Sequence, residues 1–315
     1  MEHLHIVAST MSPAAPKTTN GLPEEGNRPP PVHPVSKPGN NTILRRMVAR
    51  LATKCLSWRA RKDTVTFWSP SICYKQTKNL SEPYAMQLVG QQTAVPVPKV
   101  LIAWTDKKGK THLVMDRIKG KEPGPLWDNY SSEEKKAVAS QLKDYVAQYR
   151  AMKASCTTVG SADYSPFDNE LFCLEGNGPF KDVSDFHCSE CAGYSMNLPN
   201  TVAKLKQFHS SRYFGPVFTH GDLAPRNILV KGKKIVGIVD WGSSGWYPDY
   251  WEYTSSWYTN WRNPDFRDHR DGFLEAFPYA LEIEQLRWQY CAIWGRPHQI
   301  EDDKVEVQPQ NGDYT

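Results

Sequence analysis

One polar stretch restricts the fold of this chain more than any other: THGDLAPRNILV at residues 219–230, followed by GIVDW at residues 237–241. Apolar and β-branched runs lie before, between and after its polar residues, which predicts strand, loop, strand, turn and strand in that order. Asp222 and Asn227 then share one loop, and a hairpin returns Asp240 to the side of that loop. An ordinary loop that uses Asp and Asn as turn residues is the alternative interpretation.

The residue types in this stretch fit phosphoryl transfer. In that reaction the protein mainly positions the reacting groups and stabilises their charge, and it forms few covalent bonds itself. One carboxylate must hold an acceptor hydroxyl and take its proton. A second carboxylate and an amide oxygen must hold Mg²⁺, a hard ion that prefers oxygen ligands. Gly221 allows a tight turn, and Arg226 adds a cation whose partner the sequence does not identify. His220 is expected to support the loop rather than to act as a base.

The composition describes a mostly globular chain without a strong electrostatic specialisation. Its 315 residues are enough for one large domain or two lobes, and 39% of them are hydrophobic. A formal net charge of +4 is too small to favour a nucleic-acid partner, and no apolar stretch is long enough to span a membrane. Seven widely spaced cysteines and an N-terminus unlike a secretory signal favour a reducing compartment, so we expect a cytoplasmic protein.

Four segments follow one another along the chain. Residues 1–40 contain eight of the 24 prolines and few large apolar residues, which predicts a disordered Pro-rich tail. Residues 41–117 are rich in β-branched and aromatic residues and predict a sheet lobe. Residues 118–300 have mostly helical periodicity and predict a second lobe, and the polar residues 301–315 predict a second disordered tail.

The sheet lobe is predicted to consist of two hairpins with a helix between them. Its strands are TVTFW, SICYK, PKVLIAW and THLVMDRI. The helix is expected in LSEPYAMQLVGQQT, with Ser81 as its N-cap. In the second lobe we expect helices at residues 131–152, 199–211 and 273–294, the first with a capping box of Ser131 and Glu134.

Residues 155–195 have an irregular pattern that predicts no regular element. Strands followed by helices favour an α+β fold with two lobes, and a cleft between lobes is a common ligand site. The sequence does not determine the oligomeric state.

The residues HGDLAPRNILV and GIVDWGSSGWYPDYWE resemble the aminoglycoside phosphotransferase-type kinase family, in particular its fungal branch. TAVPVPKVLIAW, LVMDRIKG and GPFKDVSDFH match the same branch, and the resemblance covers about residues 60–295. It implies a bilobal, protein-kinase-like fold with a nucleotide-binding sheet lobe and a catalytic helical lobe. It also implies ATP as donor, Asp222 as catalytic base, and Asn227 and Asp240 as Mg²⁺ ligands.

The resemblance further implies a nucleotide site in the sheet lobe. Such kinases use a strand lysine for the α- and β-phosphates and a helix glutamate that orients it. Lys75 and Glu82 are assigned these roles, with Lys78 as the alternative to Lys75. Main-chain groups of the segment joining the lobes would contact adenine, and the candidates are Asp116, Arg117 and Ile118.

Two features depart from the kinase pattern. No glycine occurs between Gly39 and Gly90, so a glycine-rich phosphate loop is absent. The turn WSPS at residues 68–71, or the region around LATKCLSW, must then cover the phosphates. DWGSSG also lacks the acidic residue often found two places after the metal-binding Asp.

The charge pattern of residues 261–275 indicates which class of small molecule accepts the phosphoryl group. Aminoglycosides are polycations that require an acidic pocket, but WRNPDFRDHRDGFLE alternates in sign. Seven of the eleven tryptophans lie between residues 241 and 294, and some could line a pocket for a flat, apolar or quaternary-ammonium substrate. The sequence therefore favours a small hydroxyl-bearing metabolite over an antibiotic.

Two other functions remain as alternatives. A pseudokinase or binding protein is compatible with the missing glycine loop, and a protein kinase is less favoured because no A-P-E-like end follows Asp240. His187, Cys188 and Cys191 could contribute to a metal or redox site, but the absence of a second C-x-x-C pair favours ordinary structural roles.

Overall fold

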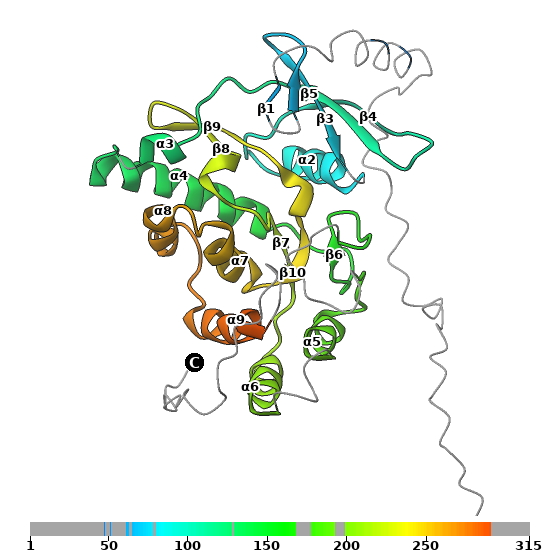
Figure 1. The fold of residues 1–315 in the computed structure, drawn as a ribbon, viewed down its shortest axis with the longest axis vertical. Helices are drawn as coiled ribbons and strands as arrows, with labels where there is room; N and C mark the ends of the chain where they lie inside the picture. The colour runs from blue at the N-terminus through cyan, green and yellow to red at the C-terminus, as the bar shows by residue number, and fades with distance from the viewer. Residues whose placement is uncertain are drawn as a thin grey trace, which may run out of the picture.

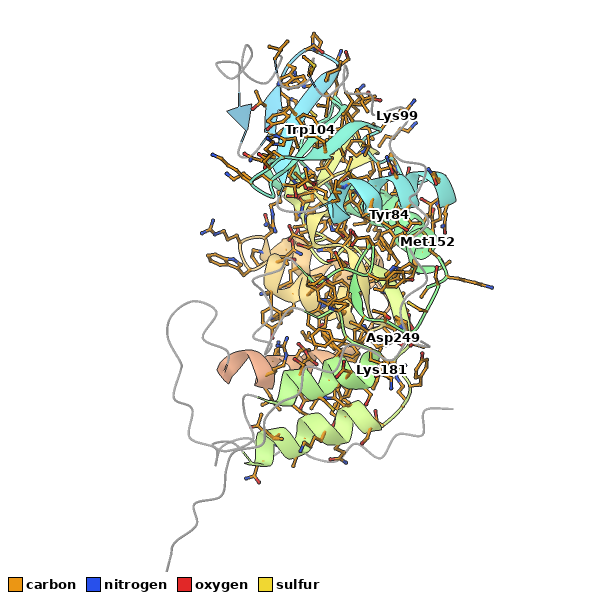
Figure 2. All side chains as sticks on the ribbon, turned by 90° about the vertical axis from the view of Figure 1, so that its right-hand side faces the viewer. Tyr84, Lys99, Trp104, Met152, Lys181 and Asp249 are labelled. Carbon is orange, nitrogen blue, oxygen red and sulfur yellow. The ribbon has the colours of Figure 1, made fainter. Side chains whose placement is uncertain are left out.

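The computed structural model describes residues 61–62, 65–77, 80–127, 129–167, 178–192 and 199–290, with the single residues 47 and 51. The two predicted tails, at 1–40 and 301–315, lie outside the described residues. A sheet lobe lies against a larger, mostly helical lobe (Figure 1). Figure 2 labels Trp104 in the sheet lobe and Asp249 and Lys181 toward the opposite end of the molecule.

The sheet lobe contains one antiparallel sheet with the strand order β1-β2-β3-β5-β4. Its elements are β1 (Arg61–Lys62), β2 (Val65–Phe67), β3 (Ile72–Thr77), α2 (Ser81–Gln92), β4 (Val100–Thr105) and β5 (Thr111–Asp116). The two predicted hairpins and the helix between them are therefore present.

Strand alternation determines which side chains meet the helix. Successive residues of a strand point to opposite faces of the sheet. Cys73 packs with Met86 of α2 in the main core, whereas Tyr74 packs with Trp104 in a separate cluster. Lys75 is two residues after Cys73, so the same alternation directs it to the face that α2 covers.

The helical lobe encloses two small sheets. Its helices are α3 (Gly124–Trp127), α4 (Ser132–Arg150), α5 (Val183–Ala192), α6 (Pro199–Ser210), α7 (Trp251–Thr259), α8 (Pro264–Asp268) and α9 (Pro278–Tyr290), with short 3-10 turns η2 (Pro225–Asn227), η3 (Trp241–Ser243) and η4 (Arg270–Gly272). Its strands are β6 (Gly160–Ser161), β7 (Pro216–Thr219), β8 (Ile228–Lys231), β9 (Lys234–Ile238) and β10 (Gly245–Pro248). β8 and β9 form a hairpin, and β6, β10 and β7 form a three-stranded sheet.

Helix α4 is the central support of this lobe and lies beneath the β8–β9 hairpin (Figure 1). Its predicted capping box is confirmed: Ser131 Oγ accepts from the Glu134 N–H, and Glu134 Oε2 accepts from the Ser131 N–H. Its apolar side, which includes Val138, Leu142 and Val146, is fully buried in the main core. This helix packs against β7 and β9, the strand before the loop of Asp222 and the strand before Asp240.

Three expectations from the sequence were wrong. Ser81 is not the N-cap of α2: Leu80 occupies that position, and Ser81 Oγ accepts from the Ala162 N–H at 3.1 Å. Residues 155–195 are not wholly irregular, because α5 begins at Val183, after Asp182, which accepts from the Asp185 N–H at 2.9 Å. The helix expected over 273–294 begins only at Pro278, since proline is tolerated in the first turn but not inside a helix.

Among the described helices, none combines the length and the apolar content that crossing a bilayer requires.

Candidate active site

A buried lysine joins the two lobes. Lys75 Nζ on β3 donates to Glu82 Oε1 on α2 at 2.7 Å and to Asp240 Oδ1 at 2.6 Å. Asp240 is 165 residues away in sequence and follows β9 of the helical lobe. Lys75 and Glu82 are buried, whereas the Asp240 side chain is 48% exposed. The three predicted residues therefore meet at the junction of the lobes, with the Asp240 carboxylate open to solvent on one side. Lys78 lies outside the described residues.

The charges in this cluster shift one another's pKa. Burial alone would lower the pKa of Lys75, but the carboxylates of Glu82 and Asp240 outweigh it and the pKa is raised. Burial raises the pKa of Glu82, although Lys75 opposes this. Burial also acts to raise the pKa of Asp240, yet Lys75 brings it below its usual value. Lys75 thus stays a cation beside an ionised Asp240.

The loop between β7 and β8 holds a second cluster. Asn227 Nδ2 donates to Asp222 Oδ2 at 2.8 Å and to the Asp222 carbonyl at 2.8 Å. Arg226 Nη2 pairs with the other carboxylate oxygen of Asp222, which identifies the partner that the sequence left open. Asp222 is therefore held in one orientation by an amide and a guanidinium.

His220 connects the Lys75–Glu82–Asp240 cluster with the Asp222 cluster. Its Nε2 lies 3.1 Å from the Val239 carbonyl, and its Nδ1 accepts from the Asp222 N–H at 3.2 Å. The ring thus bridges the residue before Asp240 and the backbone of Asp222. Its one acceptor nitrogen, Nδ1, is already occupied, so no free lone pair remains for an external base role. This geometry matches the structural part expected for His220.

Glu252, in the first turn of α7, is an anchor that the sequence did not reveal. Its buried carboxylate accepts from the N–H of His220 at 2.7 Å, from the N–H of Gly221 at 3.2 Å and from the hydroxyl of Tyr149 at 2.9 Å. The only sequence signal was an acidic residue in an aromatic segment, YPDYWE, with no indication of its distant partners.

Replacing Glu252 with Gln tests this anchor. The amide NH₂ cannot accept from a backbone N–H, so at least one buried donor loses its partner, and we expect a loss of roughly 2–4 kcal/mol in the free energy of unfolding. Urea unfolding measures the change. Tyr149→Phe is the matched control: it removes a single donor to the same carboxylate, with an expected cost of about 1 kcal/mol. Equal stability of Glu252→Gln and the parent protein would contradict the anchor role.

Close backbone contact also holds the loop against the turn after Asp240. Gly221 has φ +78°, and a Cβ there would lie 2.5 Å from the Ser243 carbonyl oxygen of η3. Asp240 itself has φ 64°, in the left-handed region. Only glycine avoids both the strain and the clash at position 221, so this residue lets the loop of Asp222 approach the turn of Asp240.

The segment joining the lobes presents few unused main-chain groups. The Asp116 N–H donates to the Lys99 carbonyl at 3.0 Å, and the Arg117 N–H donates to the Ser71 carbonyl at 2.9 Å. Among the described residues, the Ile118 N–H has no such partner. The predicted adenine contacts are thereby narrowed to the Ile118 N–H and to carbonyls of this segment.

The turn at residues 68–71 lies beside this joining segment, because Ser71 accepts from Arg117. The other hairpin turn, between β1 and β2, comes immediately before Val65, which pairs with Lys75 across the sheet. WSPS is therefore at the wrong end of β3 to cover phosphates held by Lys75. Residues 63–64, which connect β1 to β2, lie outside the described residues, as do residues 52–58 of LATKCLSW.

The donor set fits a hard divalent cation. Asn227 uses its Nδ2 for Asp222, so its amide oxygen Oδ1 is directed elsewhere and accepts no hydrogen bond from the described residues. Asp240 uses Oδ1 for Lys75, and its second oxygen has no such partner in the described chain. One amide and one carboxylate oxygen are ligands of the kind that Mg²⁺ takes together with phosphate oxygens.

A third cluster, away from these two, is formed by His187, Glu190 and His209 and lies between α5 and α6. Its potential ligand atoms are within 4.8 Å of one another. However, the two imidazole rings are stacked, with centroids 3.7 Å apart and planes 5° apart. A metal bound to a histidine lies in the plane of its ring, so one ion cannot satisfy both parallel rings. Burial lowers the pKa of His187 to about 2 and that of His209 to about 3, which keeps both neutral.

The rest of that cluster is structural. Glu190 lies 3.3 Å from Arg287 Nε, and His187 Nε2 lies 2.9 Å from the Tyr250 hydroxyl. Cys188 is exposed and free, and the side chain of Cys191 lies outside the described residues. The stacked geometry disfavours the metal role considered for this segment.

Fold and site together define a bilobal, protein-kinase-like protein, in which a lysine–glutamate pair of the sheet lobe meets Asp240 of the helical lobe and an Asp222–Asn227 pair occupies the loop between β7 and β8. The chain belongs to the phosphotransferase enzyme family, whose sequence profile matches residues 64–287.

Solved structures of aminoglycoside phosphotransferases are similar to this chain. APH(4)-Ia is 14% identical over 78% of this chain and 89% of its own, with a TM-score of 0.49. The streptomycin–ATP–APH(2")-IIa ternary complex is 13% identical over 80% and 90%, with a TM-score of 0.46. A thermostable mutant of APH(4)-Ia in ternary complex with AMP-PNP and hygromycin B is 16% identical over 69% and 76%, with a TM-score of 0.47. No curated protein matches the sequence.

Proposed function

We propose that this protein is an ATP- and Mg²⁺-dependent O-phosphotransferase that phosphorylates a hydroxyl group of a small molecule. The observation that carries this proposal is the contact of Lys75 with both Glu82 and Asp240 across the two lobes. A buried lysine between two carboxylates is suited to hold nucleotide phosphates near a metal ligand. The fungal branch indicated by the sequence motifs, and a cytoplasmic location, belong to the same proposal.

Each residue has one role in the proposed reaction. Lys75, oriented by Glu82, binds the α- and β-phosphates, and the main chain of residues 116–118 contacts adenine. Asp222 accepts the proton of the acceptor hydroxyl. Its two neighbours, Arg226 and Asn227, fix the direction in which its carboxylate faces. The acceptor oxygen then bonds to the γ-phosphorus as the bond from that phosphorus to the β,γ-bridging oxygen breaks and ADP leaves.

Asn227 and Asp240 would hold Mg²⁺ through the two oxygens described above. When bound, the ion neutralises phosphate charge and fixes the γ-phosphoryl group for in-line transfer. Asp240 has a lowered pKa, so its carboxylate is ionised and available as a ligand at neutral pH.

The connection after Asp240 argues against a protein kinase. Only η3 and β10 separate Asp240 from α7, which begins at Trp251. β10 pairs with β7 and β6, so the backbone of this short connection is used in a sheet. A protein kinase uses a long segment here to bind its peptide substrate. A small-molecule acceptor is the better match to this site.

Thermal unfolding tests the proposal directly. We expect the melting temperature to rise when ATP and Mg²⁺ are added together, and to rise less with either alone, because a ligand of the native state stabilises it by mass action. Saturation to about 100 times Kd adds roughly 2.7 kcal/mol. Lys75→Ala should lose this response, while Lys108→Ala in the exposed β4–β5 turn should keep it. An unchanged melting temperature with every nucleotide and metal combination would overturn the proposal.

A further inference from the structure

The segment after α7 lies directly beside the loop of Asp222. Arg226 Nη1 donates to the Thr259 carbonyl at 3.1 Å, and Asn260 Nδ2 donates to the Leu223 carbonyl at 2.9 Å. Arg226 also pairs with the Asp222 carboxylate, so a single guanidinium separates that carboxylate from the end of α7. The residues that follow this helix therefore lie beside the loop that carries Asp222.

Those residues form an exposed arginine–tryptophan pair. Trp261 is 60% exposed, and the guanidinium carbon of Arg262 lies 4.4 Å from the centroid of its ring. In the part of the chain that the structure describes, no carboxylate forms an ion pair with Arg262. A guanidinium offers donors in a fork that matches carboxylate and phosphate oxygens, and an indole provides a flat apolar surface. Arg262 covers one face of this ring, so the pair combines a guanidinium that forms no ion pair among the described residues with the exposed remainder of the indole as a surface for a planar group.

Three of the four acidic residues in this segment already have a cationic partner, which disfavours the binding of a polycation; the fourth, Glu275, is exposed. The ion pairs are Asp265 with Lys135 at 2.8 Å, Asp268 with Arg267 at 2.9 Å and Asp271 with Arg270 at 3.7 Å. Most of the charges in this part of the sequence are therefore in ion pairs, and Glu275 and Arg262, which form none among the described residues, balance one another. They leave no surplus of negative charge for an aminoglycoside.

A quaternary-ammonium acceptor is disfavoured by the neighbouring tryptophan. Arg267 lies 4.0 Å and Arg270 lies 4.9 Å from the ring centroid of Trp257. These guanidinium groups occupy the position over the ring that a ligand ammonium would take. The aromatic residues of this rim are consequently partners of arginine, not a cage for a cation.

We propose that the acceptor is an alcohol that carries an oxyanion, either carboxylate or phosphate, next to a flat apolar group. Arg262 binds the oxyanion, Trp261 packs against the apolar group, and the hydroxyl is directed to Asp222. This inference rests on the proposed function and specifies the acceptor of the same site. The hydroxyl proton passes to Asp222, the acceptor oxygen gains the γ-phosphoryl group, and ADP is the leaving group.

Four benzyl alcohols that differ only in the group para to the hydroxymethyl test the charge preference. They are 4-(hydroxymethyl)benzoate, 4-(hydroxymethyl)phenyl phosphate, the neutral 4-methylbenzyl alcohol and the cationic 4-(trimethylammonio)benzyl alcohol. Saturation-transfer NMR in the presence of MgADP measures their binding, and ADP release from MgATP measures transfer. We expect the two anionic compounds to bind about tenfold more tightly than the neutral one, as charge-assisted hydrogen bonds imply. The stronger of the two identifies carboxylate or phosphate as the natural group.

Arg262→Glu supplies the residue-specific test. Its side chain is exposed, so the fold tolerates the change, and we expect the anionic preference to disappear while binding of the neutral alcohol stays within about twofold. Lys108→Glu changes the net charge equally in the other lobe and should retain the preference. The inference is overturned if neutral or cationic compounds bind as well as the anions, if Arg262→Glu has no effect, or if none binds to a protein that MgATP still stabilises. Failure of the proposed function would differ, since MgATP itself would then not stabilise the protein.

Discussion

The Asp222→Asn protein should bind MgATP about as well as the parent protein but transfer the γ-phosphoryl group about 10²–10⁴-fold more slowly, the range typical for removal of a general base. Asparagine keeps the shape of the side chain, but its single amide oxygen can accept from Arg226 or from Asn227 and not from both. It cannot accept the acceptor's proton. Binding is measured by titration with MgATP, and transfer by the rate of ADP release with the best acceptor and with water alone.

Asp144→Asn is the matched control for this experiment. Asp144 is an exposed residue of α4 in the same lobe, so the substitution makes the same chemical change away from the site. Its turnover should equal that of the parent protein. If Asp222→Asn retained full turnover, Asp222 would not be the base. If it lost MgATP binding as well, the carboxylate would serve the nucleotide or the metal instead.

Removal of the Asp240 carboxylate should have the second large effect. We expect Asp240→Ala to bind ATP with similar affinity in the presence and absence of Mg²⁺, because the charged ligand for the ion is lost. Turnover should fall by at least about 10²-fold, as for other losses of preorganised electrostatic stabilisation. The ratio of Kd values for ATP with and without Mg²⁺ is the decisive quantity. In the parent protein this ratio should differ clearly from one.

The Asp240→Ala substitution also removes a partner of Lys75, so a loss of stability must be distinguished from a loss of metal binding. Without Asp240, Lys75 keeps only Glu82 as a carboxylate partner, so the free energy of unfolding should be measured alongside binding. Asp144→Ala removes an exposed carboxylate and should change neither quantity. The metal role of Asp240 is excluded if the variant retains the Mg²⁺ dependence of the parent protein.

Much of the local structure could be predicted because its signals lie within short windows of sequence. The capping box of Ser131 and Glu134 spans one helical turn, and the β8–β9 hairpin is indicated by two apolar runs around KGKK. By contrast, Ser81 is a residue type that often caps helices, but its hydroxyl accepts from the Ala162 N–H, because this partner from the other lobe competes for it. The intrinsic preference of a residue for a helix end determines its role only where no tertiary contact takes its side chain elsewhere.

The sequence by itself determined the residue types of the site and their spacing along one loop and one hairpin. Asp222, Asn227 and Asp240 lie within 19 residues of one another, so local strand and turn geometry is sufficient to bring them near. Only the tertiary structure decided what surrounds them. Lys75 meets Asp240 because strand alternation and the packing of α2 on η3 bring distant segments together. Glu252 reaches the loop through the packing of α7, and no short window of sequence records which buried N–H groups a distant carboxylate will accept from.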